Sequence, residues 1–254
     1  MAGAASESVG AHREWLLSFV PQVERLTFLD LGCGAGPDLI ELAARRPDPI
    51  SRFVGVDSSP DAVAAARAAA SGEGRVELVQ ADIDQGLPFA DSVFDCAYSH
   101  NLIECLRDPA AHVAELARVL RPGGTVILAH WDWDTQLFDG SDRALVRRLV
   151  QGYADRRQEW MAGVDPWLGR RLWGICNTSG AFRGEVVSRT LIETSFSPGL
   201  YGYDRAQDFR ELVGDGVVTP EECEGFFAEQ RELDAEGRYF YAVTGFAYVG
   251  WKAS

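Results

Sequence analysis

A glycine-rich turn near the N-terminus constrains the fold more than any other feature of the sequence. The apolar segment Phe28–Leu31 runs directly into Gly32, Gly34 and Gly36, and a segment with helical spacing of leucine and alanine follows. Glycines at such a point let a strand turn sharply into a helix and let a ligand approach bare backbone. A strand that passes at once into a helix is typical of a parallel sheet covered by helices.

The alternation of strand and helix continues through the first half of the chain. Apolar segments predict further strands at Arg52–Val56, Val76–Val79, Phe94–Ser99 and Thr125–His130, with helical segments between them. Two later segments rich in β-branched and aromatic residues predict two long strands, at 185–194 and 239–251. We therefore expect an α/β fold with a mostly parallel sheet.

The segments around this core predict one domain rather than two, because no linker rich in proline or glycine divides the chain. Residues 1–26 predict an N-terminal helix, and residues 27–130 form the expected core. Residues 131–181 predict loops and helices with several tryptophans, and residues 195–236 contain an acidic helical stretch. These last two segments are expected to form a helical cap inserted after the fifth strand, over the side of the sheet where ligands bind.

Charge and composition exclude several classes of function. The 38 acidic and 24 basic residues give a net charge of −14, which repels phosphate backbones and argues against nucleic acid or an anionic membrane as partner. The one lysine, Lys252, excludes enzymes that need an interior lysine for a Schiff base or a phosphate loop. Five scattered cysteines without a CxxC pair predict reduced thiols in a cytoplasmic protein, and no metal-ligand spacing is present. The oligomeric state is left open.

Aspartates stand at three successive strand ends, where ligands bind in open α/β sheets. Asp30 precedes the glycines and suits an ammonium group better than a pyrophosphate, and Pro37 replaces the third glycine of the dinucleotide fingerprint. Asp57 can accept hydrogen bonds from two ribose hydroxyls, and Asp82 can accept one from an adenine amino group. The side chains that flank the predicted adenine ring are Ile83 and Ser58.

In order and spacing, these segments, together with 94–104 and 118–124, resemble the class I S-adenosylmethionine-dependent methyltransferases, especially the group with small-molecule and quinone substrates. The resemblance covers residues 28 to about 130. It implies a three-layer, Rossmann-like sheet of seven strands with the last antiparallel. It also implies S-adenosylmethionine as cofactor, with S-adenosylhomocysteine as product. The residues implied to hold the methionine end are Asp30, Gly32, Gly34 and Gly36, with Ser99 nearby; Asp57 would bind the ribose, and Asp82 and Ile83 the adenine.

Candidates for acceptor chemistry follow the fourth and fifth strands. His100 and His130 can each serve as a general base, although a structural role for either is the simpler interpretation, and Asp132 is a third candidate. Trp133 and Tyr203 are candidates for binding the acceptor. The tryptophans at positions 160, 167 and 173 are expected to pack inside the cap.

The sequence thus predicts a small-molecule methyltransferase acting on nitrogen or oxygen, in a biosynthetic tailoring pathway. A carbon methyltransferase would share every cofactor residue, so that hypothesis stays open. Two less favoured hypotheses are a nicotinamide dehydrogenase, which Asp30 and Pro37 oppose, and a non-catalytic cofactor-binding protein of the same fold.

Overall fold

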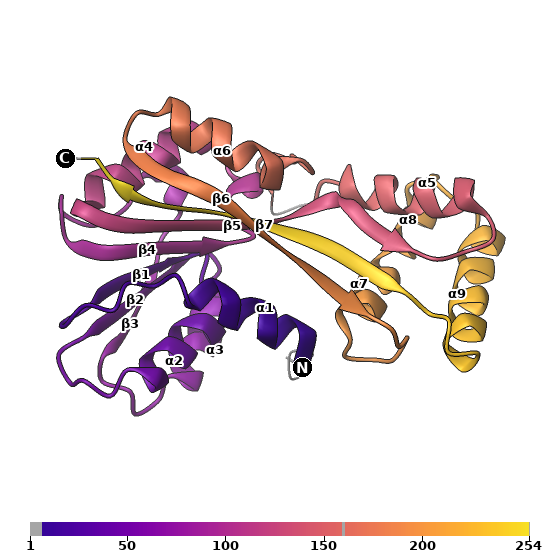
Figure 1. The fold of residues 1–254 in the computed structure, drawn as a ribbon, viewed down its shortest axis with the longest axis horizontal. Helices are drawn as coiled ribbons and strands as arrows, with labels where there is room; N and C mark the ends of the chain where they lie inside the picture. Colours follow the sequence, from indigo (N-terminus) through magenta and orange to yellow (C-terminus); the bar gives the residue numbers. More distant parts are fainter. Residues whose placement is uncertain (1–6, 159–160, 254) are drawn as a thin grey trace.

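A seven-stranded sheet forms the centre of the computed structural model, which describes residues 7–158 and 161–253 (Figure 1). Its strand order is β3-β2-β1-β4-β5-β7-β6; strands β1 to β5 are parallel, and β7 is antiparallel to both of its neighbours. The predicted fold class is therefore confirmed. The strands are β1 (Thr27–Leu31), β2 (Arg52–Asp57), β3 (Val76–Gln80), β4 (Phe94–His100), β5 (Leu120–Phe138), β6 (Phe182–Glu193) and β7 (Tyr241–Lys252).

Helices cover both faces of this sheet. Leucines of α1 and α2 pack on one face and apolar residues of α4 and α6 pack on the other, which gives the three layers. Helix α3 starts as predicted, because Pro60 occupies its first turn and the Ser59 hydroxyl accepts the Ala62 N–H (3.2 Å). The helices of this part are α1 (Glu7–Leu17), α2 (Pro37–Arg45), α3 (Pro60–Ala69), α4 (Pro109–Val119) and α6 (Leu168–Thr178), with short 3₁₀ turns η1 (Ile83–Gln85) and η2 (Ile103–Cys105).

A second lobe lies at one end of the sheet, where β5, β6 and β7 extend beyond the other strands (Figure 1). The prediction that the fifth strand ends at His130 was wrong, because β5 pairs with β7 through Asp132 and again at Leu137 and Phe138. Aromatic side chains form the core of this lobe, with Phe138, Phe209 and Phe226 in mutual contact. Its helices are α5 (Arg143–Ala154), α7 (Tyr201–Asp208), α8 (Glu211–Gly214) and α9 (Pro220–Ala235).

The expectation that the cap tryptophans are buried was also wrong where the structure describes them. Trp167 and Trp173 expose 43% and 47% of their surface, while Trp160 lies outside the described residues. Trp167 instead packs against the Arg170 guanidinium, 5.0 Å from its ring.

In the parts of the chain that the structure describes, none of the helices has the length and apolar character needed to cross a membrane.

Candidate functional site

The first cavity of interest has a volume of about 650 Å³ and lies at the carboxyl ends of the parallel strands. It brings together five of the predicted cofactor residues, which come from three different strand ends. The turn after β1 contributes Gly32, the end of β2 contributes Asp57 and Ser58, and the segment after β3 contributes Asp82 and Ile83.

The glycine turn that borders this cavity depends on backbone conformations that favour glycine. Gly32, Gly34 and Gly36 have φ angles of 66°, 53° and 76°. A Cβ on Gly32 would lie 2.9 Å from Leu102 Cδ1, so a larger residue would force the Leu102 side chain to shift in addition to adopting the unfavourable φ. The turn is fastened by Asp57, whose carboxylate accepts the backbone N–H of Gly34 at 2.9 Å.

Asp30 lies beneath this turn and does not line the cavity. The residue is 3% exposed. Burial first, and then the nearby Asp38 and Asp57 carboxylates, raise the pKa of its carboxyl group well above the ordinary value. Asp38 accepts hydrogen bonds from Arg13 and from the Tyr98 hydroxyl, the latter at 3.0 Å. Asp30 therefore lies close to a buried polar network, made by Arg13, Asp38 and Tyr98, that joins α1, α2 and β4.

A second cavity of about 400 Å³ adjoins the first, since Asn101 and Met161 line both. Most of its remaining wall combines aromatic rings with charged groups, which come from η2, from β5 and from α5, α7 and α8 of the second lobe or the residues next to them. The side chains used below are Glu104, Trp133, Tyr153, Arg156, Tyr201, Arg205, Asp208 and Glu211.

Asn101 stands at the junction of the two cavities in a left-handed conformation with φ of 57°. Asparagine tolerates this conformation better than most residues, but it still marks a local constraint. Two hydrogen bonds to β5 impose it: the Asn101 N–H donates to Ala129 O (3.0 Å), and the Asn101 side-chain oxygen accepts the Trp131 N–H (3.1 Å). The side chain is therefore fixed where the two cavities meet.

Glu104 presents a buried carboxylate to the second cavity. The Trp133 indole N–H donates to both of its oxygens, at 3.2 and 3.1 Å. His130 Nε2 lies 3.4 Å from Glu104 Oε1. His130 is 1% exposed and does not line the cavity. His130 Nδ1 is 2.6 Å from the Trp131 carbonyl, and since a carbonyl only accepts, Nδ1 carries the hydrogen.

The other residues predicted for acceptor chemistry line neither cavity. His100 is packed 5.4 Å from His12, and burial lowers its pKa to about 4, so the ring is neutral. Asp132 is fully buried and paired with both nitrogens of the Arg170 fork, which occupies its oxygens. Tyr203 packs 4.8 Å from Phe196 in the core of the second lobe.

Ser99 and the remaining glycines occupy supporting positions. The Ser99 hydroxyl is fully buried and has no hydrogen-bond partner among the described residues. Gly34 and Gly36 shape the turn without lining the first cavity.

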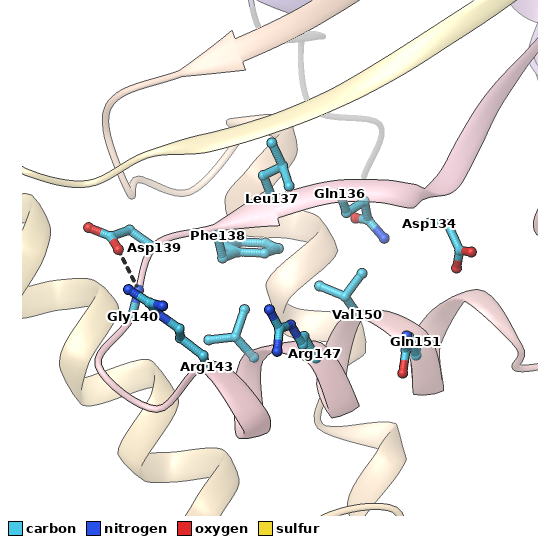
Figure 2. A pocket seen from close by; sticks show the side chains of 11 residues that line it. Asp134, Gln136, Leu137, Phe138, Asp139, Gly140, Arg143, Arg147, Val150 and Gln151 are labelled. Atoms are coloured by element: carbon cyan, nitrogen blue, oxygen red, sulfur yellow. Dashed lines mark hydrogen bonds between the residues drawn. The ribbon is translucent and has the colours of Figure 1, made fainter.

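A third cavity, of about 450 Å³, lies in the second lobe between β5 and α5 (Figure 2). Phe138 and Val150 contribute its apolar surface, and Arg143 and Arg147 extend from α5 along it. It shares no lining residue with the first cavity. A molecule bound there would not adjoin the glycine turn.

Sequence reasoning missed several residues of the second cavity. Glu104 had a usable signal, because an acid between Ile103 and Cys105 interrupts an apolar turn that follows a strand. Tyr153 and Arg205 had none, since they come from helices about 50 and 100 positions further along the chain. Their hydrogen bond, Arg205 Nη1 to the Tyr153 hydroxyl at 2.6 Å, joins α7 to α5.

Comparison with known proteins agrees with the resemblance to methyltransferases. The family model of the methyltransferase domain matches residues 29–128. An uncharacterised 37.1 kDa protein from a transposon of Streptomyces fradiae is 33% identical over 97% of this chain and 68% of its own length.

Relatives of stated activity align over a smaller part of the chain. An ajmaline N-methyltransferase of Rauvolfia serpentina is 26% identical, over 66% of this chain and 62% of its own length. A ubiquinone/menaquinone biosynthesis C-methyltransferase of Geotalea daltonii is 32% identical over 48% of this chain, and the match spans only 53% of that relative. Among solved structures, a Haemonchus contortus phosphoethanolamine N-methyltransferase in complex with S-adenosyl-L-methionine superposes with a TM-score of 0.56 at 19% identity, covering 94% of this chain and 52% of that one.

Proposed function

Because this chain belongs to the class I S-adenosylmethionine-dependent methyltransferases, we propose that it methylates a nitrogen or oxygen atom of a small molecule bound in the cavity of Glu104. The observation that carries the proposal is the adjacency of two cavities that share Asn101 and Met161. Methyl transfer needs donor and acceptor in contact, and the cavity between β5 and α5 does not offer that contact.

The first cavity fits S-adenosylmethionine by the chemistry of its lining. Asp57 and Asp82 stand at neighbouring strand ends, where carboxylates can accept hydrogen bonds from ribose hydroxyls and from an adenine amino group. Gly32 leaves bare backbone at the turn. The Ser99 hydroxyl, which has no hydrogen-bond partner among the described residues, adds a buried hydrogen-bonding group on the neighbouring strand, paired with Leu31. When bound, the cofactor supplies a methyl group already activated on a sulfonium.

The protein itself then has to position the acceptor and exclude water. Asn101, fixed by its two hydrogen bonds to β5, lines both cavities where they adjoin, beside the point where the reacting atoms would meet. Alignment of two reactants in this way can supply on the order of 7–11 kcal/mol through effective molarity. Asp132 is removed from the set of candidate bases by its ion pair with Arg170. His130 remains a candidate, because its Nε2 lies 3.4 Å from the carboxylate of Glu104, which lines the acceptor cavity.

Both nitrogen and carbon methyltransferases occur among the relatives, so the methylated atom has to be identified from the reaction product. The test is to incubate the protein with S-adenosylmethionine labelled with ¹³C at the methyl group and a mixture of small amines, alcohols and phenols. We expect the ¹³C methyl resonance of a product at the chemical shift of an N-methyl or O-methyl group. A carbon-bound methyl group would refute the proposed acceptor class. No transfer to any compound, with S-adenosylhomocysteine bound normally, would count against catalysis in this cavity.

A further inference from the structure

In the acceptor cavity one carboxylate, Glu104, has no arginine or lysine partner among the described residues, and its ion-pair contact, His130 Nε2 at 3.4 Å, is charged only when the ring is protonated. Arg205 is paired with Asp208 (2.9 Å), and Arg156 is paired with Glu211 (2.5 Å). Glu104 is the remaining charged group of the lining. Among residues 7–158 and 161–253, no arginine or lysine nitrogen lies within 4 Å of its oxygens.

Because Glu104 is buried, the lack of an arginine or lysine partner has an energetic cost. Glu104 is 8% exposed, and a carboxylate taken out of water costs several kcal/mol unless it is paired or well hydrogen-bonded. The Trp133 indole N–H is a neutral donor, and it supplies the only hydrogen bonds to Glu104 among the described residues. The carboxylate is therefore kept in a place where a positively charged ligand would pair with it.

The walls around Glu104 suit a cation with an apolar body. The rings of Trp133 and Tyr153 meet edge to face, 5.5 Å apart, and Tyr201 and Met161 complete the apolar surface. Aromatic rings attract cations and bury hydrocarbon at the same time. The overall charge of −14 also favours approach of cations over anions.

From these observations we infer that Glu104 is the acceptor-binding carboxylate and that the acceptor is an amine, which enters the cavity as an ammonium ion. This inference rests on the proposed function and narrows it to nitrogen. It assigns to Glu104 a role in binding that selects the substrate class.

The proton of the ammonium ion has a destination within the site. Nitrogen can attack only after losing a proton, and Glu104 contacts the ammonium while His130 Nε2 lies 3.4 Å behind it. The proton passes to this Glu104–His130 pair. The nitrogen lone pair then forms the N–C bond as the C–S bond breaks, the sulfur keeps the electron pair, and the proton leaves to solvent afterwards.

The experiment is a binding titration in saturating S-adenosylhomocysteine, which prevents turnover. The probes are butylamine, phenethylamine and piperidine, each compared with the alcohol or carboxylate of matching skeleton, and the readout is tryptophan fluorescence with thermal midpoint. We expect at least one amine to bind saturably and more tightly than its matched compounds. Glu104→Gln should weaken that amine at least 10-fold while leaving S-adenosylhomocysteine affinity unchanged.

Two further variants make the result specific. Glu224→Gln removes a carboxylate that is paired with Arg210 and lines neither cavity, so it should change amine affinity less than 3-fold. Glu104→Asp keeps the charge and should retain the preference for amines, even if the shorter side chain lowers affinity.

Three outcomes overturn the inference: no amine binds, the alcohols or carboxylates bind as well as the amines, or Glu104→Gln binds the amine as tightly as the wild type. Failure of the wild-type protein to bind S-adenosylhomocysteine is a different result, because it refutes the proposed function itself.

Discussion

Replacement of Asp57 by alanine separates the two roles that the structure gives this carboxylate. In the folded chain it accepts the N–H groups of Gly34 and Ser59, each at 2.9 Å. Hydrogen bonds to a charged group contribute about 1.5–3 kcal/mol each, and less where water competes, as it does at this half-buried side chain. We expect Asp57→Ala to lower the free energy of unfolding by about 2 kcal/mol, a thermal midpoint shift of roughly 4–8 °C for a domain of this size.

Asp57→Ala is expected to have its larger effect on the affinity for the cofactor. Loss of a carboxylate that accepts from the ribose should weaken S-adenosylhomocysteine about 100-fold, by the same energy per charged hydrogen bond. At a concentration 100 times the wild-type Kd, the ligand stabilises the wild type by about 2.7 kcal/mol, but a variant bound 100-fold more weakly by only about 0.4 kcal/mol. Thermal unfolding with and without ligand measures this difference.

Asp61→Ala is the matched control, because Asp61 is an exposed acid in the first turn of α3, four positions away. It should keep the full stabilisation by ligand. If Asp57→Ala were stabilised as much as the wild type, the assignment of this cavity to the cofactor would be wrong.

Three more predictions concern buried side chains. Burial lowers the pKa of His112 from 6.5 to about 4, so between these pH values the unfolded chain binds a proton that the folded chain does not. The free energy of unfolding therefore falls as the pH drops from 6.5 towards 4. Urea titrations should show a smaller fall with pH for His112→Gln, and an equal pH dependence would contradict the assignment. Arg170→Ala leaves Asp132 buried and unpaired and should lower the free energy of unfolding by about 3–5 kcal/mol in chemical denaturation. Asp132→Asn should lower it less and should keep methyl transfer. Loss of methyl transfer in a stably folded Asp132→Asn variant would make Asp132 a candidate base again. All five cysteines are buried, so Ellman's reagent should label them only after unfolding, and rapid labelling of the native protein would contradict the packing.

Local patterns were sufficient to predict the core of the fold. Apolar strands, glycine turns and capping residues such as Ser59 act within a few positions of one another, so they are readable in one dimension. The cofactor candidates Asp57 and Asp82 could be predicted for the same reason, since parallel strands place their carboxyl ends along one edge.

The second lobe and the acceptor cavity depend on contacts between distant segments. β5 continues past His130 because β7 pairs with it there, and that pairing joins residues more than 100 positions apart. Tyr201 lines the cavity whereas Tyr203, two positions on, faces the lobe core, because residues two apart on a helix point in different directions. Without the helix boundaries, the sequence does not distinguish these two tyrosines.

The most direct test of the central claim is calorimetric titration of the wild-type protein with S-adenosylhomocysteine and, in a separate experiment, with NAD. We predict saturable binding of one S-adenosylhomocysteine per chain and no heat of binding with NAD. Binding of NAD alone would contradict the assignment of the glycine turn and Asp57 to S-adenosylmethionine, and so would the absence of binding by either ligand.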